Sequence, residues 1–362
     1  MSDARAPSTL DDSYEGAPAS RGDAAADWAA LDTAAGIVDS RWRRFFPATG
    51  EERREFLHGQ TTAHVTSLTG GSGAAALVLT AQGKPLAMLA LYESGERLWI
   101  STTAARSAAA RAALSRFLVA DDCDFEDDVD ACCVTVAGPH AATVLAAAGA
   151  SAAAALDPWA MGGANIAGQA VLVFSRGDLR VPCFDVLACD EEGRASDGAA
   201  VRAAIEAAGA ARCGVAAFEI LRVESGAARY GVDVDETRLA VEARLEWAIH
   251  FNKGCYVGQE VVERAVSRGR INHELCLLKL SGEAAAGSRV DGGNENDVVT
   301  SVVRSPRLGT IALAYVPRAK ADAGTAVTVL ADGASVEAVV LPWPRQRTLT
   351  GRPIKKMGSD PI

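Results

Sequence analysis

The chain has 362 residues, which is more than one hydrophobic core usually organises, so two or three domains are expected. Hydrophobic residues make up 49% of it and charged residues 23%, a composition typical of a globular protein with packed cores. Its formal net charge of −10 excludes broad, sequence-independent binding to nucleic acid, because neutralising phosphates requires an excess of Lys and Arg.

The eight cysteines indicate a reducing compartment. They include no Cys-x-x-Cys pair and show no dense disulfide spacing. The five histidines are scattered along the sequence, so ligand spacing predicts no metal site. The sequence also shows no signal peptide and no uninterrupted run of about 18 apolar residues. We therefore predict a cytoplasmic protein that does not enter a membrane.

The two ends of the chain differ from the middle in composition. Residues 1–30 carry Asp, Ser, Gly, Pro and Ala without apolar periodicity, and we predict a disordered leader there. Residues 345–362 include a basic, Pro-containing stretch and are predicted to form a flexible tail. A solvated tail is the simpler interpretation, and an RNA- or partner-binding arm is the alternative.

Residues 53–130 are predicted to form a ferredoxin-like α+β domain. A helical pattern over 51–68 precedes three short apolar runs at 75–80, 85–92 and 97–101. The dipeptides Gln82-Gly83 and Ser94-Gly95 are turn signals between paired strands. A second helical pattern follows at 104–119.

A second α+β domain is predicted from residues 31–52 together with 131–274. It contains expected strands at 132–136, 170–174 and 180–188 and expected helices at 141–148 and 198–208. From residue 275 to 344 the pattern changes to short strands broken by Gly, Asn and Pro, which indicates a β-barrel domain. Its expected strands are 275–280, 298–303, 310–315, 326–330 and 336–341.

Residues 241–252 place their apolar side chains at helical spacing, which predicts an amphipathic helix that ends at Lys253-Gly254. Gly254 and Gly258 can both take the positive φ that turns a chain sharply. A further helix is expected from Gln259, so Cys255 should lie in a loop between two glycines.

Cys255 is the most plausible reactive thiol in the sequence. The neighbouring Lys253 ammonium and the N-terminus of the following helix both favour a thiolate. The alternative is a packed, inert cysteine, as a lone cysteine without a placed base usually is. Neither His250 nor His273 stands in a recognisable nucleophile–base pattern with it.

The segment Lys253-Gly254-Cys255-Tyr256-Val257-Gly258-Gln259-Glu260 matches the K-G-C-Y-x-G-Q-E signature of the YgfZ family and its mitochondrial counterparts at every fixed position. Further stretches fit the same family at 56–60, 82–84, 221–226, 230–233 and 299–306. The chain therefore resembles the YgfZ family, relatives of the glycine-cleavage T-protein, over roughly residues 31–343.

The resemblance implies an α+β fold: a three-domain GcvT-like ring with a C-terminal β-barrel and a central channel that holds tetrahydrofolate or a derivative. It implies that Cys255 is the functional thiol. The implied folate contacts are Glu224, Lys253, Arg222 and Tyr256, and the implied loop-shaping residues are Gly254, Gly258, Gln259 and Glu260. A carboxylate such as Glu224 can accept two N–H donors from a pterin edge. Taken alone, Glu224 is more simply interpreted as a surface acid near Arg222, and Lys253 has an exposed lysine as its alternative.

One departure separates this chain from T-proteins, which carry an aspartate where Ala87 and Met88 stand here. Neither side chain exchanges a proton, and such acid–base assistance is typically worth about 100- to 10,000-fold in rate. The resemblance thus implies a folate-binding accessory protein for assembly or repair of iron–sulfur clusters in client enzymes, including tRNA-modifying ones. A folate-dependent aminomethyltransferase and an RNA-binding protein remain the alternatives, and whether a covalent step occurs stays open.

Overall fold

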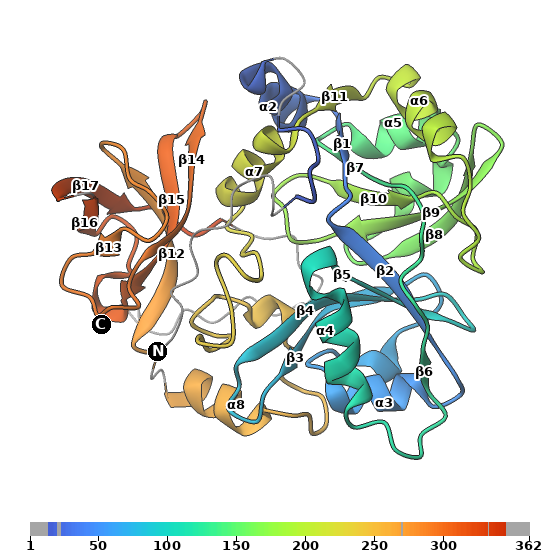
Figure 1. Ribbon diagram of the computed structural model, residues 1–362, viewed down its shortest axis with the longest axis horizontal. Helices are drawn as coiled ribbons and strands as arrows, with labels where there is room; N and C mark the ends of the chain where they lie inside the picture. Colours follow the sequence, from blue (N-terminus) through green and yellow to red (C-terminus); the bar gives the residue numbers. More distant parts are fainter. Residues whose placement is uncertain (1–13, 20–22, 269–270, 332, 345–362) are drawn as a thin grey trace, which may run out of the picture.

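The computed structural model describes residues 14–19, 23–268, 271–331 and 333–344. Its three β-sheets belong to three domains arranged around the middle of the molecule (Figure 1). A central cluster of buried side chains draws on all three sheets, from Leu77 through Phe174 to Leu313. The ring-like α+β architecture is therefore confirmed.

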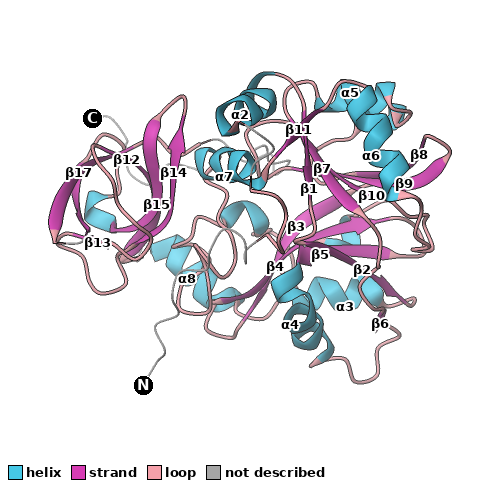
Figure 2. Ribbon diagram, turned by 45° about the horizontal axis from the view of Figure 1, so that its top comes forward, coloured by secondary structure: helices cyan, strands magenta, loops and turns pink. Residues whose placement is uncertain are grey.

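The first sheet has six strands in the order β11-β1-β7-β10-β9-β8. Adjacent residues of β1 enter different cores: Ile37 packs with α5 and α6, and Val38 packs with α2 and α7. Helices thus cover both faces of this sheet (Figure 2). The elements are α2 (Ala24–Thr33), β1 (Gly36–Asp39), β7 (Cys133–Ala137), α5 (Ala141–Ala147), η2 (Ser151–Ala155), β8 (Met161–Ile166), β9 (Gln169–Arg176), β10 (Cys183–Leu187), α6 (Gly198–Ala207), β11 (Ala211–Cys213) and α7 (Val215–Glu224).

The second sheet has five strands in the order β3-β4-β5-β2-β6. Successive side chains of β4 point to opposite faces of the sheet. Ala87, Leu89 and Leu91 pack under helices α3 and α4, whereas Met88 and Ala90 face the central cluster. The elements are β2 (Arg43–Thr49), α3 (Arg53–Gln60), η1 (Val65–Ser67), β3 (Gly73–Leu79), β4 (Pro85–Glu93), β5 (Leu98–Thr103), α4 (Ala104–Ser115) and β6 (Asp124–Phe125).

The third sheet is an antiparallel C-terminal half-barrel in the order β13-β16-β17-β12-β15-β14. Strand β17 alternates exposed and buried residues, so one face packs inward and the other meets solvent. The elements are η3 (Glu246–Ala248) and α8 (Gln259–Arg268), which precede the sheet, and β12 (His273–Leu280), β13 (Arg289–Val290), β14 (Val299–Ser305), β15 (Gly309–Pro317), η4 (Arg318–Lys320), β16 (Ala326–Ala331) and β17 (Ala334–Val340).

Most of the predicted strands are confirmed, together with their turns. Gly83 and Gly95 adopt φ values of +74° and +95° in the turns after β3 and β4, as the two turn signals required. Strand β8 was missed because its Gly162-Gly163 pair weakens a strand pattern.

Several boundaries differ from the sequence predictions. Part of the predicted leader is folded: α2 begins at Ala24 with Asp23 as its N-cap, and Tyr14 is buried. Strand β2 belongs to the five-stranded sheet rather than to the domain predicted from residues 31–52 together with 131–274. That sheet gives its domain one strand more than the β-α-β-β-α-β order of a ferredoxin-like unit. The basic tail lies outside the described residues.

The predicted helix over 241–252 is wrong. The segment forms consecutive turns and the short η3, and Arg244 has a φ of +55° that an α-helix cannot contain. Val241, Leu245 and Ile249 are nevertheless buried in the central cluster, as the pattern required, whereas Phe251 is exposed.

Candidate functional site

A pocket of about 60 Å³ lies between the inner face of the five-stranded sheet, the end of β9 and the turn η3. Met88 contributes from β4, and Trp247 contributes from η3. The residues that shape it are Arg43, Met88, Trp159, Arg176, Asp178 and Trp247. Ala87, the neighbour of Met88, points to the opposite face of the sheet, so Met88 alone of the two meets the pocket.

The polar wall of this central pocket is held by ion pairs. Arg43 Nε donates to Asp185 Oδ2 at 3.0 Å, and Arg43 Nη2 donates to Ser101 Oγ at 2.5 Å. Arg176 donates to both carboxylate oxygens of Asp178 at 3.0 and 2.6 Å. Burial would raise the pKa of Asp178, but the Arg176 guanidinium lowers it below its usual value. The pocket therefore holds a fixed carboxylate at neutral pH.

Cys255 is exposed in the loop before α8, and every other cysteine is buried or partly buried. Burial raises the pKa of Cys189 and Cys213 to about 12, so these thiols stay protonated near neutral pH. The predicted accessibility of the Cys255 thiol is confirmed. Its chemical role stays a prediction.

The two loop glycines differ in conformation. Gly258 has a φ of +85°, and a Cβ there would lie 2.5 Å from the carbonyl oxygen of Thr80. Gly254 does not take the predicted positive φ, and a Cβ there would meet only His58 Nε2 at 3.7 Å. Gly258 therefore turns the chain into α8, where Gln259 and Glu260 begin the helix.

Lys253 is buried, so the exposed-lysine alternative is wrong. Its Nζ donates to the carbonyl oxygens of His58, Thr61 (2.6 Å) and Ala63 (2.9 Å) at the end of α3. The ring of Tyr256, itself buried, lies 5.1 Å from the same nitrogen. Burial lowers the pKa of Lys253 to about 8. This side chain ties the signature loop to the five-stranded domain, and its contact with a folate stays a prediction.

Three histidines that are scattered in the sequence meet beside this loop. The ring centroids of His58 and His64 are 4.8 Å apart, and those of His64 and His250 are 5.0 Å apart. Burial and the nearby Lys253 charge lower the pKa of His58; burial and the nearby His64 lower that of His250. Among the described residues, no group of three His, Cys, Asp or Glu side chains is arranged to hold a metal ion.

Glu224 is buried at the end of α7, so it is not a surface acid. Its Oε2 accepts from Arg180 Nη2 at 2.7 Å and from Arg307 Nη2 at 3.1 Å, and its Oε1 accepts from Ser305 Oγ at 2.5 Å. A pterin edge would have to replace one of these partners. The folate contact of Glu224 stays a prediction.

Arg222 lies at the contact between α7 and the C-terminal half-barrel. Its guanidinium donates to Glu219 and Asp233 at 2.6 to 2.7 Å and to Ser301 Oγ on β14 at 2.7 Å. These partners link α7 to the half-barrel. Neither Arg222 nor Glu224 lines the central pocket.

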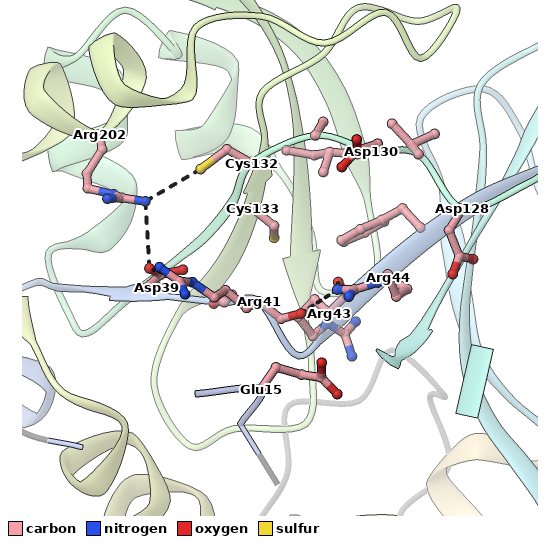
Figure 3. Close-up of a pocket in the computed structure, with 15 residues that line it drawn as sticks. Glu15, Asp39, Arg41, Arg43, Arg44, Asp128, Asp130, Cys132, Cys133 and Arg202 are labelled. Atoms are coloured by element: carbon pink, nitrogen blue, oxygen red, sulfur yellow. Dashed lines mark hydrogen bonds and ion pairs between the residues drawn. The ribbon is translucent and has the colours of Figure 1, made fainter. Parts of the chain in front are cut away.

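A larger cavity of about 470 Å³ lies where the chain crosses between the first two sheets (Figure 3). Arg202 points toward Cys132 and Asp39, with its Nη2 3.5 Å from Cys132 Sγ and 3.9 Å from Asp39 Oδ2. Arg43 lines both this cavity and the central pocket. The arginines are balanced by acidic residues, so charge alone favours no ligand here. These residues are Arg41, Arg43, Arg44 and Arg202 with Glu15, Asp39, Asp128 and Asp130.

Sequence reasoning missed the central-pocket residues other than Met88. Trp159 follows Asp157-Pro158, a turn signal, and a tryptophan at a turn could have been singled out as a candidate. Trp247 lies within the segment predicted as a helix, and no local pattern distinguishes it from the apolar residues around it.

Comparison with known proteins places this architecture in a family. A model of the GCVT N-terminal domain matches residues 12–253, more than half of the chain. The chain belongs to that family. A model of the glycine cleavage T-protein C-terminal barrel domain matches residues 274–345, the region of the half-barrel.

Relatives of this GCVT-family protein cover most of its length. An aminomethyltransferase from Saccharopolyspora erythraea is 29% identical over 336 residues, 89% of this chain and 90% of that protein. An aminomethyltransferase from Nostoc sp. is 27% identical over 336 residues, 88% of this chain and 86% of that protein. The crystal structure of the glycine cleavage system aminomethyltransferase T from Bartonella henselae has a TM-score of 0.76 at 21% identity, covering 89% of each chain. The GcvT-like fold is thus shown; YgfZ membership within it stays a proposal.

Across the part of the chain that the structure describes, no helix combines the length and apolar character needed to cross a membrane.

Proposed function

We propose that this GCVT-family protein binds tetrahydrofolate or a derivative in the central pocket. The observation that carries the proposal is the pairing of two tryptophan rings with a fixed carboxylate, Asp178, around one pocket. A pterin has a flat pyrimidine half with N–H donors on its edge, and it is recognised by ring surface plus a carboxylate acceptor. Asp178 is the acceptor that lines this pocket, whereas Glu224, the acceptor that the family resemblance implied, lies outside its lining.

Calorimetric titration with tetrahydrofolate tests the binding and its place. Met88→Trp fills the central pocket and should abolish saturable binding, whereas Arg202→Gln in the larger cavity should leave the affinity unchanged. Loss of binding in Arg202→Gln with retention in Met88→Trp would move the site to the larger cavity. Absence of binding to the unsubstituted protein would reject folate as the ligand.

Two functions are compatible with such a site: aminomethyl transfer and an accessory role. The names of the relatives support aminomethyl transfer more directly than any accessory role. Two features of this chain support the accessory role: Met88, which carries no ionisable proton, occupies the pocket, and Cys255 is exposed in the signature loop. On these features, and on the resemblance of residues 253–260 to the YgfZ signature, we infer an accessory protein for iron–sulfur clusters of client enzymes, including tRNA-modifying ones, in a cytoplasm that keeps its eight free cysteines reduced.

Replacing Cys255 by Ser tests the accessory role. Because the side chain is exposed, Cys255→Ser should keep the thermal stability and folate affinity of the protein but fail to restore iron–sulfur enzyme activity in cells that lack it. Cys132→Ser, at a partly buried thiol, is the matched control and should restore activity. Full complementation by stably folded Cys255→Ser would show that the thiol has no functional part.

The transferase candidate is favoured by the relatives and has its own assay. With purified glycine-cleavage partner proteins, the unsubstituted chain should show no sustained aminomethyl transfer to tetrahydrofolate, because Met88 supplies no acid or base. Met88→Asp should raise any residual rate. Robust turnover by the unsubstituted chain would establish the transferase and reject the accessory role.

The RNA-binding alternative depends on the basic tail, which the structure does not describe. Deleting residues 345–362 and measuring client activity separates it from the other two, since only an RNA-binding role requires the tail.

A further inference from the structure

Trp159 and Trp247 form a parallel stacked pair in the central pocket. Their ring centroids lie 5.6 Å apart and their planes differ by 9°. Trp159 comes from the turn before β8, and Trp247 comes from η3, so the pair joins two distant segments. Flat indole faces offer a planar heterocycle a large contact area.

The backbone of Trp159 is held in a rare conformation. Its φ is +64°, which a bulky side chain seldom adopts outside sites that impose it. Trp159 N donates to the carbonyl oxygen of Ser175 at 3.0 Å. Its own carbonyl oxygen lies so near Gly73 that a Cβ on that glycine would be 2.4 Å away. The first and second domains together therefore fix Trp159 as a rigid wall.

Trp247 is held less firmly. It stands on a three-residue turn, and its side chain is only partly buried. Its Nε1 is a buried donor without a hydrogen-bond partner. A buried indole N–H normally finds an acceptor, so this one is available to an oxygen of a ligand.

The pocket in this state is too small for a bicyclic ring. Its volume of about 60 Å³ compares with roughly 300–1,000 Å³ for ordinary ligand pockets. One wall must move for a pterin to enter. Trp247, on its short turn, is the wall with the weaker anchoring, and Trp159 is the one that stays.

We propose that a folate ligand separates the two tryptophans and stacks its pterin on Trp159, with Trp247 closing over the other face. This inference rests on the proposed folate binding and names the surface that carries it. The inserted ring forms one stacking contact with each tryptophan, and the two tryptophans lose their contact with each other. Stacking on two indole faces therefore contributes to the affinity.

Titration of four proteins with tetrahydrofolate tests the inference. Trp247→Leu should weaken the affinity about 10-fold or more, within the range known for a lost stacking contact. Trp247→Phe keeps a ring and should lose less. Trp343→Phe is the matched control, because that ring packs against Arg244, 4.8 Å away, and does not line the pocket, and it should bind like the unsubstituted protein.

Tryptophan fluorescence supplies a second measurement. Binding should quench emission in the unsubstituted protein, and Trp247→Phe should show a smaller quench. Unchanged affinity and quench in the Trp247 variants, with normal binding by the unsubstituted protein, would overturn the stacking role and leave folate binding intact. No binding by the unsubstituted protein would overturn both. If thermal unfolding shows that Trp247→Leu does not fold, Trp247→Phe decides the question.

Discussion

The hydrogen-bond partners of Glu224 determine the role of its carboxylate. Its position in the stretch 221–226, which fits the YgfZ family, implied a folate contact, yet its carboxylate already accepts from Arg180, Arg307 and Ser305. A charge buried this way is stabilised only while its hydrogen-bonding partners are present. The same residue therefore has a structural role that its identity alone could not reveal, because two of its partners lie about 80 residues away in the half-barrel.

Removing the carboxylate should destabilise the protein. Glu224→Ala leaves two arginines without their shared partner, and we expect the free energy of unfolding to fall by about 2 kcal/mol. The loss stays below that of a fully buried pair because Arg307 is nearly half exposed and can turn to water. Urea unfolding measures it. Glu224→Gln keeps the shape and one acceptor and should lose less.

The same variants locate the folate contact. If Glu224 meets the pterin, folded Glu224→Gln should bind tetrahydrofolate more weakly than the unsubstituted protein in calorimetry. Equal affinity would remove Glu224 from the site and leave Asp178 as the acceptor. Unchanged stability of Glu224→Ala would instead contradict the structural role.

At the scale of the elements, the loop before α8 contains two glycines, Gly254 and Gly258, that differ in conformation although the sequence does not distinguish them. Gly258→Ala must combine a φ of +85° with a Cβ 2.5 Å from a backbone oxygen. We expect it to lower the free energy of unfolding by at least about 2 kcal/mol. Gly254→Ala has neither problem and should stay within about 0.5 kcal/mol of the unsubstituted protein.

Thermal unfolding of both glycine variants checks the difference, and their folate affinities show whether the loop shape matters for binding. Equal melting temperatures for Gly254→Ala and Gly258→Ala would mean that the loop adapts to a Cβ at either position.

Elements with a regular pattern could be predicted from the sequence, and those fixed by distant contacts could not. Strands β3 to β5 alternate or run apolar between glycine turns, so their existence followed directly. Helix α7 was missed because nearly all its side chains are buried, which leaves no polar face to mark the helical period. The segment 241–252 does not form a helix because part of its backbone hydrogen-bonds to other segments. For example, Leu275 N donates to the carbonyl oxygen of Glu242.

The candidate site divides in the same way. The exposed Cys255 and the turn at Gly258 could be read from one contiguous signature. The central pocket is assembled from segments more than 200 residues apart, from Arg43 to Trp247. No local period brings such residues together, so only the folded chain shows that they meet.

At the scale of the whole molecule, the seam between the signature loop and the five-stranded domain is rich in groups that can carry positive charge. Lys253 reaches across it, and the rings of His58, His64 and His250 line up beside it. Glu55 opposes these charges at His58 but does not outweigh burial and the Lys253 charge, so the pKa of His58 is lowered. Protonating His58 or His250 next to a buried ammonium is unfavourable, so the seam should be sensitive to acid.

We expect acidification from pH 7.5 to 5.5 to weaken this seam. The pKa values of His58 and His250 are lower in the folded protein than the ordinary value of 6.5. As the pH falls through that value, the unfolded chain takes up these protons first, so the histidines' contribution to the free energy of unfolding decreases. Glu246 acts in the opposite direction, because burial raises its pKa to about 7 and the folded state then gains a proton first. The absolute change with pH therefore mixes both effects, and the histidine part must be isolated by substitution.

His250→Gln should show a smaller loss of stability between the two pH values than the unsubstituted protein, measured by urea unfolding at each pH. His140→Gln, at an exposed histidine outside the seam, should keep the full loss. If His250→Gln and the unsubstituted protein lose the same free energy on acidification, the histidine seam does not govern the acid response of this fold.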